Sequence, residues 1–310
     1  MSTFLFSVIL CTHNPRLDYL QRTLAGLERQ TLPREQWELL VIDNASQPPL
    51  EGRVDLSFHP QARIVREERL GLTAARLCGI RESAAGVIVF LDDDNVLEPD
   101  YLAHAAEIGG QWPLLGTWGG QILPEFEVTP PEWVRPYLPA LAIREIERDL
   151  WSNVPHETRA VPYGAGMCVR RAVAVAYMAA LASDPQRQTL DRCGTSLVSG
   201  GDTDLAFTAC DAGLGNGVFQ RLRLAHLIPK ERLEESYLLR LIEALSYSQV
   251  VLDSFRGIAP VRPSRSQRLF EFYCHLRIPP IERRFLAARQ RGRAAAIALI
   301  EKSKTDGAPR

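Results

Sequence analysis

The chain has 310 residues, of which 46% are hydrophobic, and a formal net charge of −1. This much apolar material can build a large core and excludes an intrinsically disordered chain. The longest uninterrupted apolar run, residues 172–182, is shorter than the roughly 18 residues of a membrane-spanning helix, so no transmembrane segment is expected. Residues 1–12 lack the basic start and the cleavage site of a signal peptide, and we expect a cytoplasmic location.

Strand-like and helix-like segments alternate in the first third of the chain. Apolar runs of strand length occur at residues 4–11, 37–42, 62–65 and 87–91. Between them, leucines at three- and four-residue steps predict a helix that ends near Gln30, and an Ala- and Leu-rich segment predicts another over residues 71–81. The alternation predicts an α/β fold with a mostly parallel central sheet flanked by helices.

Polar and acidic residues follow three of these predicted strands, at the point where each strand ends. They are Thr12 and Asn14, then Asp43 and Asn44, then Asp92, Asp93, Asp94 and Asn95. Ligands of open α/β sheets bind outside the carboxyl ends of the strands, so we expect one shared site at this edge.

The run of three carboxylates at residues 92–94 indicates a cation. Like charges this close resist joint ionisation unless a cation compensates, and oxygen ligands suit Mg²⁺ or Mn²⁺. The alternative is that residues 92–95 cap a helix predicted around residues 99–106.

The second half of the chain is less regular. Residues 118–123 and 218–227 resemble strands, and residues 124–139, with five prolines, predict a loop or lid rather than a helix. The C-terminal part is mainly helical, with breaks predicted near residues 257–263 and 279–280.

The cysteines give no indication of a zinc site, and the basic C-terminal region can attract acidic lipid or nucleic acid, although we expect no nucleic-acid partner. Neither CxxC pairs nor zinc-like spacing occurs, so we expect reduced and mostly buried thiols at Cys11, Cys78, Cys168, Cys193, Cys210 and Cys274. Residues 256–310 carry 13 Lys and Arg against 4 Asp and Glu. This basic region predicts either a solvated helical face or contact with acidic lipid at the inner face of the membrane.

Four motifs occur together in the order and spacing of a known family. They lie at residues 7–14, 43–46, 71–79 and 90–94. In this combination the chain resembles the family 2 glycosyltransferases of GT-A fold, over roughly residues 4–245. The resemblance implies a GT-A domain at residues 1–245, with a nucleotide-binding half at 1–110 and an acceptor-binding half at 111–245, followed by a basic helical extension at 246–310.

The resemblance also implies how the sugar donor is bound. Asp43 corresponds to an aspartate that accepts a hydrogen bond from the nucleotide base, uridine by default, with Thr12 and Asn14 in the same pocket. Arg76 occupies the position of an arginine that approaches the diphosphate, although Leu77 follows it where asparagine is common.

The triplet is similar to the DXD motif of this family. Asp92 and Asp93 would bind the nucleotide sugar, and Asp94 would ligate Mn²⁺ or Mg²⁺. His226 points inward from its predicted strand, either as a further metal ligand or as a hydrogen-bonded core residue.

Asp202 resembles the catalytic base of the family's ED motif, although Gly201 stands where the glutamate is usual. Asp202 would take the proton of the acceptor hydroxyl during displacement at the anomeric carbon. The alternative is that Asp202 caps a helix over residues 203–212. Asp204 is the second candidate for the base.

Glycines and aromatic residues are candidates for acceptor binding. Gly164 and Gly166 would let the backbone approach an acceptor, or would form a tight bend. Trp133, Tyr137 and Trp151 would stack on sugar faces, or would form a small core under the loop.

The sequence therefore predicts an inverting, metal-dependent glycosyltransferase that uses a UDP-sugar and a glycan or lipid-linked acceptor. A nucleotidyltransferase is a competing interpretation, but residues 12–16 offer a single basic residue and no glycine-rich triphosphate loop. A non-catalytic sugar-nucleotide-binding scaffold is the third, prompted by Gly201.

Overall fold

The computed structural model describes residues 4–155, 157–260, 264, 266, 273 and 278–306. Within these residues one nine-stranded sheet has the order β3-β2-β1-β4-β8-β6-β9-β5, and β7 pairs with β9 off this path. The strands are β1 (Phe6–Thr12), β2 (Trp37–Asn44), β3 (Ala62–Glu67), β4 (Val87–Asp92), β5 (Asn95–Leu97), β6 (Leu115–Phe126), β7 (Leu150–Ser152), β8 (Cys168–Arg170) and β9 (Gly215–Ile228).

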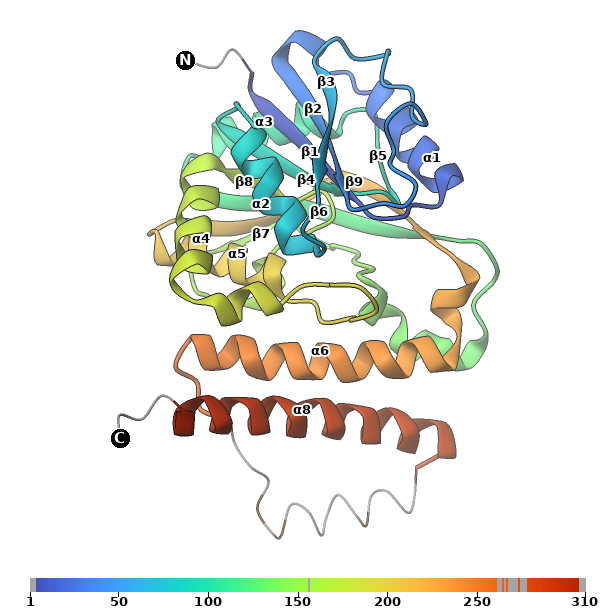
Figure 1. Ribbon diagram of the computed structural model, residues 1–310, viewed down its shortest axis with the longest axis vertical. Coiled ribbons are helices and arrows are strands. Elements are labelled where there is room, and N and C mark those ends of the chain that lie inside the picture. The colour runs from blue at the N-terminus through green and yellow to red at the C-terminus, as the bar shows by residue number, and fades with distance from the viewer. Residues whose placement is uncertain are drawn as a thin grey trace.

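Helices lie on both faces of this sheet (Figure 1). The α-helices are α1 (Leu17–Glu28), α2 (Leu72–Glu82), α3 (Tyr101–Gln111), α4 (Arg171–Ser183), α5 (Gly201–Asp211), α6 (Glu235–Phe255) and α8 (Pro280–Asp306). Short 3-10 helices are η1 (Arg34–Gln36), η2 (Glu132–Leu141), η3 (Thr158–Ala160), η4 (Pro185–Thr189) and η5 (Lys230–Leu233).

The parallel part of the sheet brings the ends of three strands to one edge. β3, β2, β1 and β4 run parallel, and Thr12 pairs with Asp43 while Cys11 pairs with Asp92. This confirms the predicted α/β fold with a central sheet flanked by helices. Beyond β4 the pairing is mixed, since β8 is antiparallel to β4 and β6 while β6 and β9 are parallel. The three-residue β8 was too short to predict from the sequence pattern.

The core divides into two layers because β1 is buried on both faces. Val8 and Leu10 face a cluster that includes residues of α1 and α3, whereas Ile9 and Cys11 face residues of α2, α4 and α5. Burial on both faces explains why this strand is a continuous apolar run rather than an alternating one.

The two long C-terminal helices pack side by side and run in the same direction (Figure 1). Phe285 of α8 stacks on Tyr137 of η2, with 3.6 Å between ring centroids, and both belong to an apolar cluster with Leu241 of α6. Arg291 forms an ion pair with Glu243 of α6 at 2.7 Å. The predicted division at 245/246 falls inside α6, which continues to Phe255.

The proline-rich segment differs from the predicted loop. β6 extends to Phe126, and residues 132–141 form η2, with Pro136 and Pro139 inside it. Proline removes the backbone donors that an α-helix needs, which restricts this segment to short 3-10 turns. Among the described cysteines, Cys11, Cys78 and Cys168 are buried, and Cys193 is exposed.

Cys274 and part of the predicted extension lie outside the described residues, namely residues 261–263, 265, 267–272, 274–277 and 307–310. In the described part of the chain, every helix is too short or too polar to cross a bilayer.

Gly292 in α8 allows a close approach to α6, because a Cβ atom there would lie 2.0 Å from the carbonyl oxygen of Glu243. We expect Gly292→Ala to lower the free energy of unfolding by roughly 1–3 kcal/mol, since the methyl group forces the helices apart. Gly110→Ala in α3 is the matched control: a Cβ atom there has no neighbour within 4 Å, and alanine should stabilise the helix by up to about 1 kcal/mol. Urea denaturation of both variants checks the prediction, which is contradicted if Gly292→Ala is as stable as the control.

Candidate active site

A cavity of about 450 Å³ lies at the edge where β1 and β4 end, and we call it the strand-end cavity. It is lined by Asp94 and Asp202, which come from opposite halves of the chain. The predicted site residues that line it are Thr12, Arg76, Asp92, Asp93, Asp94, Gly164, Asp202 and His226. The structure places Asn14, Asp43, Gly166 and Trp133 outside this lining.

The acidic triplet occupies the turn between β4 and β5. Asp92 ends β4, and β5 begins at Asn95. The following helix, α3, begins at Tyr101 with Asp100 at its N-cap. The interpretation of residues 92–95 as a helix cap is therefore wrong, and the triplet faces the cavity instead.

The pKa values of the three carboxyl groups shift in different directions because their neighbours differ. Burial and the charge of Asp94 raise the pKa of Asp93 to about 7, although the Thr12 hydroxyl donates a hydrogen bond to it. Burial also raises the pKa of Asp92. Burial opposes ionisation of Asp94 as well, but the Arg232 guanidinium beside it lowers the pKa of that carboxyl.

Arg232 of η5 joins Asp94 to His226 of β9. Its Nη2 donates to Asp94 Oδ2 at 2.8 Å and its Nη1 to His226 Nε2 at 2.9 Å, and these two acceptor atoms are 3.4 Å apart. Arginine has no acceptor atom, so in this contact the lone pair of Nε2 faces the guanidinium group. A metal ion bound through Nε2 would use the same lone pair. His226 Nδ1 is buried and has no hydrogen-bond partner among the described residues.

Asp94 and His226 supply donors that suit a divalent cation. A carboxylate oxygen and an imidazole nitrogen converge on one point, which is appropriate for Mn²⁺. In the described residues no set of three or more His, Cys, Asp and Glu is arranged around a metal position, so further ligands would have to be phosphate oxygens and water. The Arg232 guanidinium occupies the point of convergence, and a metal ion would have to displace it.

Arg76 of α2 is a second buried cation in the strand-end cavity. Its Nη1 lies 3.3 Å from Asp191 Oδ2, and both side chains are largely buried. Burial opposes its charge, yet the carboxylates of Asp191, Asp92 and Asp202 raise the pKa of Arg76. Sequence reasoning did not find Asp191, because it stands in a loop with no motif around it.

Asp202 lies in the first turn of α5, after Gly200 at the N-cap position. The interpretation of Asp202 as the N-cap is therefore wrong by two positions. Its Oδ2 accepts a hydrogen bond from the Gly164 backbone N–H at 2.9 Å, and its Oδ1 accepts one from the Thr203 N–H at 2.8 Å. These two backbone donors fix the orientation of the Asp202 side chain at the cavity wall.

Asp204 is turned away from the strand-end cavity. Its side chain is fully buried between Arg187 at 3.2 Å and Arg256 at 3.4 Å. A carboxylate closed in by two guanidinium groups cannot reach an acceptor, so Asp204 is no longer a candidate for the base.

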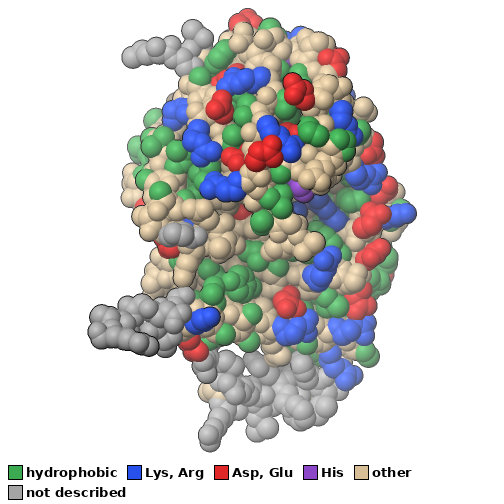
Figure 2. Space-filling model, viewed as in Figure 1, with side chains coloured by type: hydrophobic (Ala, Val, Ile, Leu, Met, Phe, Trp, Pro, Cys, Tyr) green, Lys and Arg blue, Asp and Glu red, His purple; other side chains and the backbone are tan. Residues whose placement is uncertain are grey.

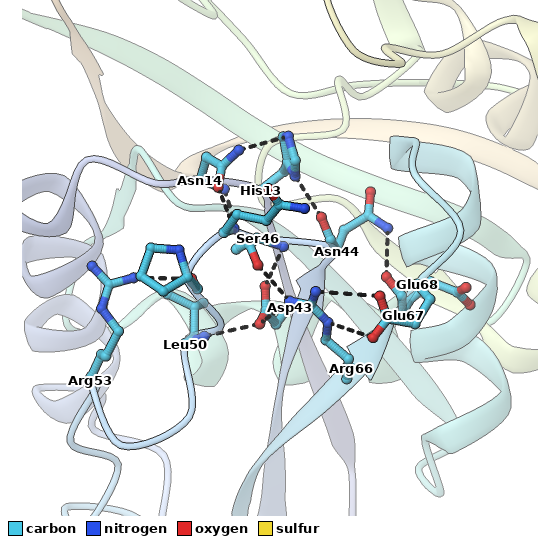
Figure 3. A network of polar contacts seen from close by, with 12 residues as sticks. His13, Asn14, Asp43, Asn44, Ser46, Leu50, Arg53, Arg66, Glu67 and Glu68 are labelled. Atoms are coloured by element: carbon cyan, nitrogen blue, oxygen red, sulfur yellow. Dashed lines mark hydrogen bonds and ion pairs between the residues drawn. The ribbon is translucent and has the colours of Figure 1, made fainter.

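Asp43 organises a loop beside the cavity (Figure 3). Its carboxylate accepts hydrogen bonds from the backbone N–H groups of Ser46 and Leu50 and forms an ion pair with Arg66 at 2.8 Å. Asn14 supports the same loop, since its N–H donates to Ser46 Oγ at 2.9 Å. Asn44, next to Asp43, lines the cavity.

Of the residues predicted to bind the acceptor, Gly166, Trp133, Tyr137 and Trp151 lie outside the cavity lining. Gly166 has φ +73°, and a Cβ atom there would lie 2.5 Å from the Tyr101 hydroxyl, so a tight bend explains this glycine. Trp133 packs near Phe285, with 6.5 Å between ring centroids, which corresponds to the alternative of a small core under the loop. The aromatic residues that do line the cavity are Tyr163 and Tyr237.

Counted by formal charge, the cavity lining is more acidic than basic. Among the described residues it contains five carboxylates and three guanidinium groups. The carboxylates are Asp92, Asp93, Asp94, Asp191 and Asp202, and the guanidinium groups are Arg76, Arg192 and Arg232. An anionic phosphate compound would be repelled here unless a further cation entered with it.

Comparison with known proteins agrees with this geometry. Residues 7–158 match the model of the family described as glycosyl transferase family 2. This segment belongs to glycosyltransferase family 2. The matched residues include β1, β2 and β4, and therefore the strand ends that form one wall of the cavity.

Two curated relatives match shorter segments. The chain is 31% identical over 91 residues to the glycosyltransferase AglE of Haloferax volcanii, covering 28% of this chain and 30% of that protein. It is 36% identical over 110 residues to the validoxylamine A glucosyltransferase of Streptomyces hygroscopicus subsp. jinggangensis, covering 33% of this chain and 26% of that protein. The matches thus span less than a third of either relative.

The fold has a solved counterpart along nearly the whole chain. The crystal structure of S. aureus TarS 1–349 superimposes with a TM-score of 0.50 at 14% identity, covering 98% of this chain and 93% of that one. At this identity the likeness concerns the fold.

Proposed function

We propose that this chain transfers a sugar from a nucleoside diphosphate donor, a UDP-sugar, to a hydroxyl group of a glycan or lipid-linked acceptor, with inversion. The observation that carries the proposal is the convergence of Asp92, Asp94 and Asp202 on one cavity in a family 2 glycosyltransferase segment. Its role would lie in glycan or polysaccharide biosynthesis.

The charge of the cavity lining supports a divalent cation as part of the proposal. Mn²⁺ or Mg²⁺ held by Asp94 and His226 would stabilise the negative charge that develops on the departing diphosphate. Asp92 and Asp93 line the same wall and would border the nucleotide sugar. Arg76 reaches the cavity from α2 and provides a fixed positive charge for the diphosphate.

Base recognition is proposed for the end of the cavity next to Asp43. Thr12 and Asn44 line it there, and Asn14 holds the adjoining loop. Asp43 Oδ2 accepts a hydrogen bond from Arg66, and an N–H group of uracil would have to replace Arg66 as the donor to this oxygen. The second oxygen would stay on the Ser46 N–H.

The proposed chemistry is a single displacement at the anomeric carbon. The acceptor oxygen forms its bond from the face opposite the leaving diphosphate, and its proton passes to an Asp202 carboxylate oxygen. The Gly164 and Thr203 N–H groups orient that carboxylate. Gly164 also lines the cavity without a side chain, which leaves space for the acceptor.

The proposal is tested by measuring release of nucleoside diphosphate over a panel of nucleotide sugars and acceptors, with Mn²⁺, Mg²⁺ or EDTA. We expect turnover with a UDP-sugar and a metal, and a fall in kcat of roughly 10²–10⁴-fold in Asp202→Asn with UDP binding retained. Asp184→Asn, outside the cavity, is the control. Absence of turnover with every donor contradicts the proposal, and release of pyrophosphate would favour a nucleotidyltransferase instead.

Arg232 and a metal ion compete for Asp94 and His226 in this proposal. A hydrogen bond to a charged group contributes roughly 1.5–3 kcal/mol, so its removal should tighten binding of Mn²⁺ by about ten- to a hundredfold in Arg232→Gln without nucleotide. Electron paramagnetic resonance of free Mn²⁺ measures this. Asp94→Asn should abolish binding in both backgrounds. Unchanged Mn²⁺ affinity in Arg232→Gln would place the metal elsewhere.

Peripheral membrane contact through the basic C-terminal region is also proposed, on charge alone. Phe285 and Ala288 of α8 are buried against the body of the protein, so these side chains are not available to insert into lipid. On the face in Figure 2, basic and acidic side chains are interspersed. We expect flotation with vesicles that contain acidic lipid and its loss at high salt. Equal flotation with neutral vesicles would contradict the proposal.

A further inference from the structure

Gly201 and Asp191 share one space at the wall of the strand-end cavity. A Cβ atom at Gly201 would lie 2.3 Å from Asp191 Oδ2 and 2.6 Å from Asp191 Cγ. Asp191, in the loop between η4 and α5, is only 6% exposed. A side chain at position 201 and the observed position of the Asp191 carboxylate therefore exclude each other. This protein has no acidic side chain at position 201, but the carboxylate of Asp191 occupies the space beside it.

The Asp191 carboxylate is held from two sides. The Thr73 hydroxyl donates to its Oδ2 at 3.1 Å, and Arg76 Nη1 donates to the same atom at 3.3 Å. Gly201 of α5 lies against the same carboxylate, and its backbone lowers the pKa of Asp191. These contacts come from α2 and α5, so Asp191 connects the donor-binding half of the chain to the helix that carries Asp202.

Arg76 continues this connection to Asp202. A Cβ atom at Gly164 would lie 2.5 Å from Arg76 Nη2 and 3.3 Å from Asp202 Oδ2. The guanidinium group thus packs against the Gly164 peptide, and the N–H of that peptide holds Asp202 Oδ2 at 2.9 Å. Movement of Arg76 would disturb the donor that orients Asp202.

We propose that Asp191 supplies the carboxylate absent from position 201 and is a positioning residue, holding Arg76 so that Gly164 and Asp202 keep their geometry. The inference rests on the proposed function, because transfer of the acceptor proton defines what Asp202 is positioned for. It assigns a role to a loop residue outside the family's motifs.

Kinetics test the positioning role. Asp191→Asn keeps the size of the side chain and removes its charge, so we expect kcat to fall about 10–100-fold, as for a small misplacement of a catalytic group, with a smaller change in donor KM. Because the two residues act as one unit, Asp191→Asn added to Asp202→Asn should lower kcat no further. Asp184→Asn, at the N-cap of η4 and outside the lining of the cavity, should leave kcat unchanged. A kcat in Asp191→Asn within about twofold of wild type, or losses that multiply with those of Asp202→Asn, would overturn the role.

A second test moves the carboxylate from position 191 to position 201 and measures stability, so it does not require enzymatic turnover. Asp191→Ala and Gly201→Glu should each lower the Tm, the first by leaving Arg76 unpaired and the second by crowding Asp191. The double variant D191A/G201E should be more stable than the sum of the two losses, and its crystal structure should show the new carboxylate on Arg76. Additive losses, or a carboxylate turned away from Arg76, would refute the exchange. If the wild type shows no turnover, the proposed function fails. The double-mutant cycle of Tm values still tests whether the Asp191 carboxylate takes the place of one at position 201.

Discussion

The structure depends on the neutralisation of carboxylates at one edge of a parallel sheet. Parallel strands end at the same edge, so the acidic residues after β4 are concentrated where water is partly excluded. Buried like charges are costly unless cations compensate them. Arg76 of α2 and Arg232 of η5 provide that compensation from distant parts of the chain, and in doing so they tie both halves of the fold to one cavity.

The two guanidinium groups divide the cavity into ends with different chemistry. Around Arg232, a carboxylate oxygen and an imidazole nitrogen converge on a cation, which suits the phosphate side of a nucleotide donor. Around Arg76, which we propose also faces the diphosphate, the contacts lead through Asp191 and the Gly164 peptide to Asp202, the base of the proposed reaction. Asp92 lies between the two ends, and Arg76 and Asp94 act on its pKa in opposite directions.

The C-terminal helices belong to the architecture of the site. Tyr237 and Leu241 of α6 line the strand-end cavity, and Leu241 is also part of the apolar cluster that contains Phe285 of α8. Support from α8 should hold this wall in place, since a helix packed on one side only is more easily displaced. The basic side chains of α8 that pair with α6, such as Arg291, contribute to the same packing.

The sequence by itself determined the α/β class, the strand ends and the glycosyltransferase motifs, because buried strands, turns and short motifs are local patterns that read directly along the chain. It also found both Asp94 and Asp202. Only the tertiary structure decided which candidates share a cavity: Asp43 holds a loop and Asp204 is enclosed by arginines. Likewise, Asp191 and Arg232 meet partners 115 and 138 residues away, and no local pattern encodes such a contact, because it arises from the packing of helices and loops on the finished sheet.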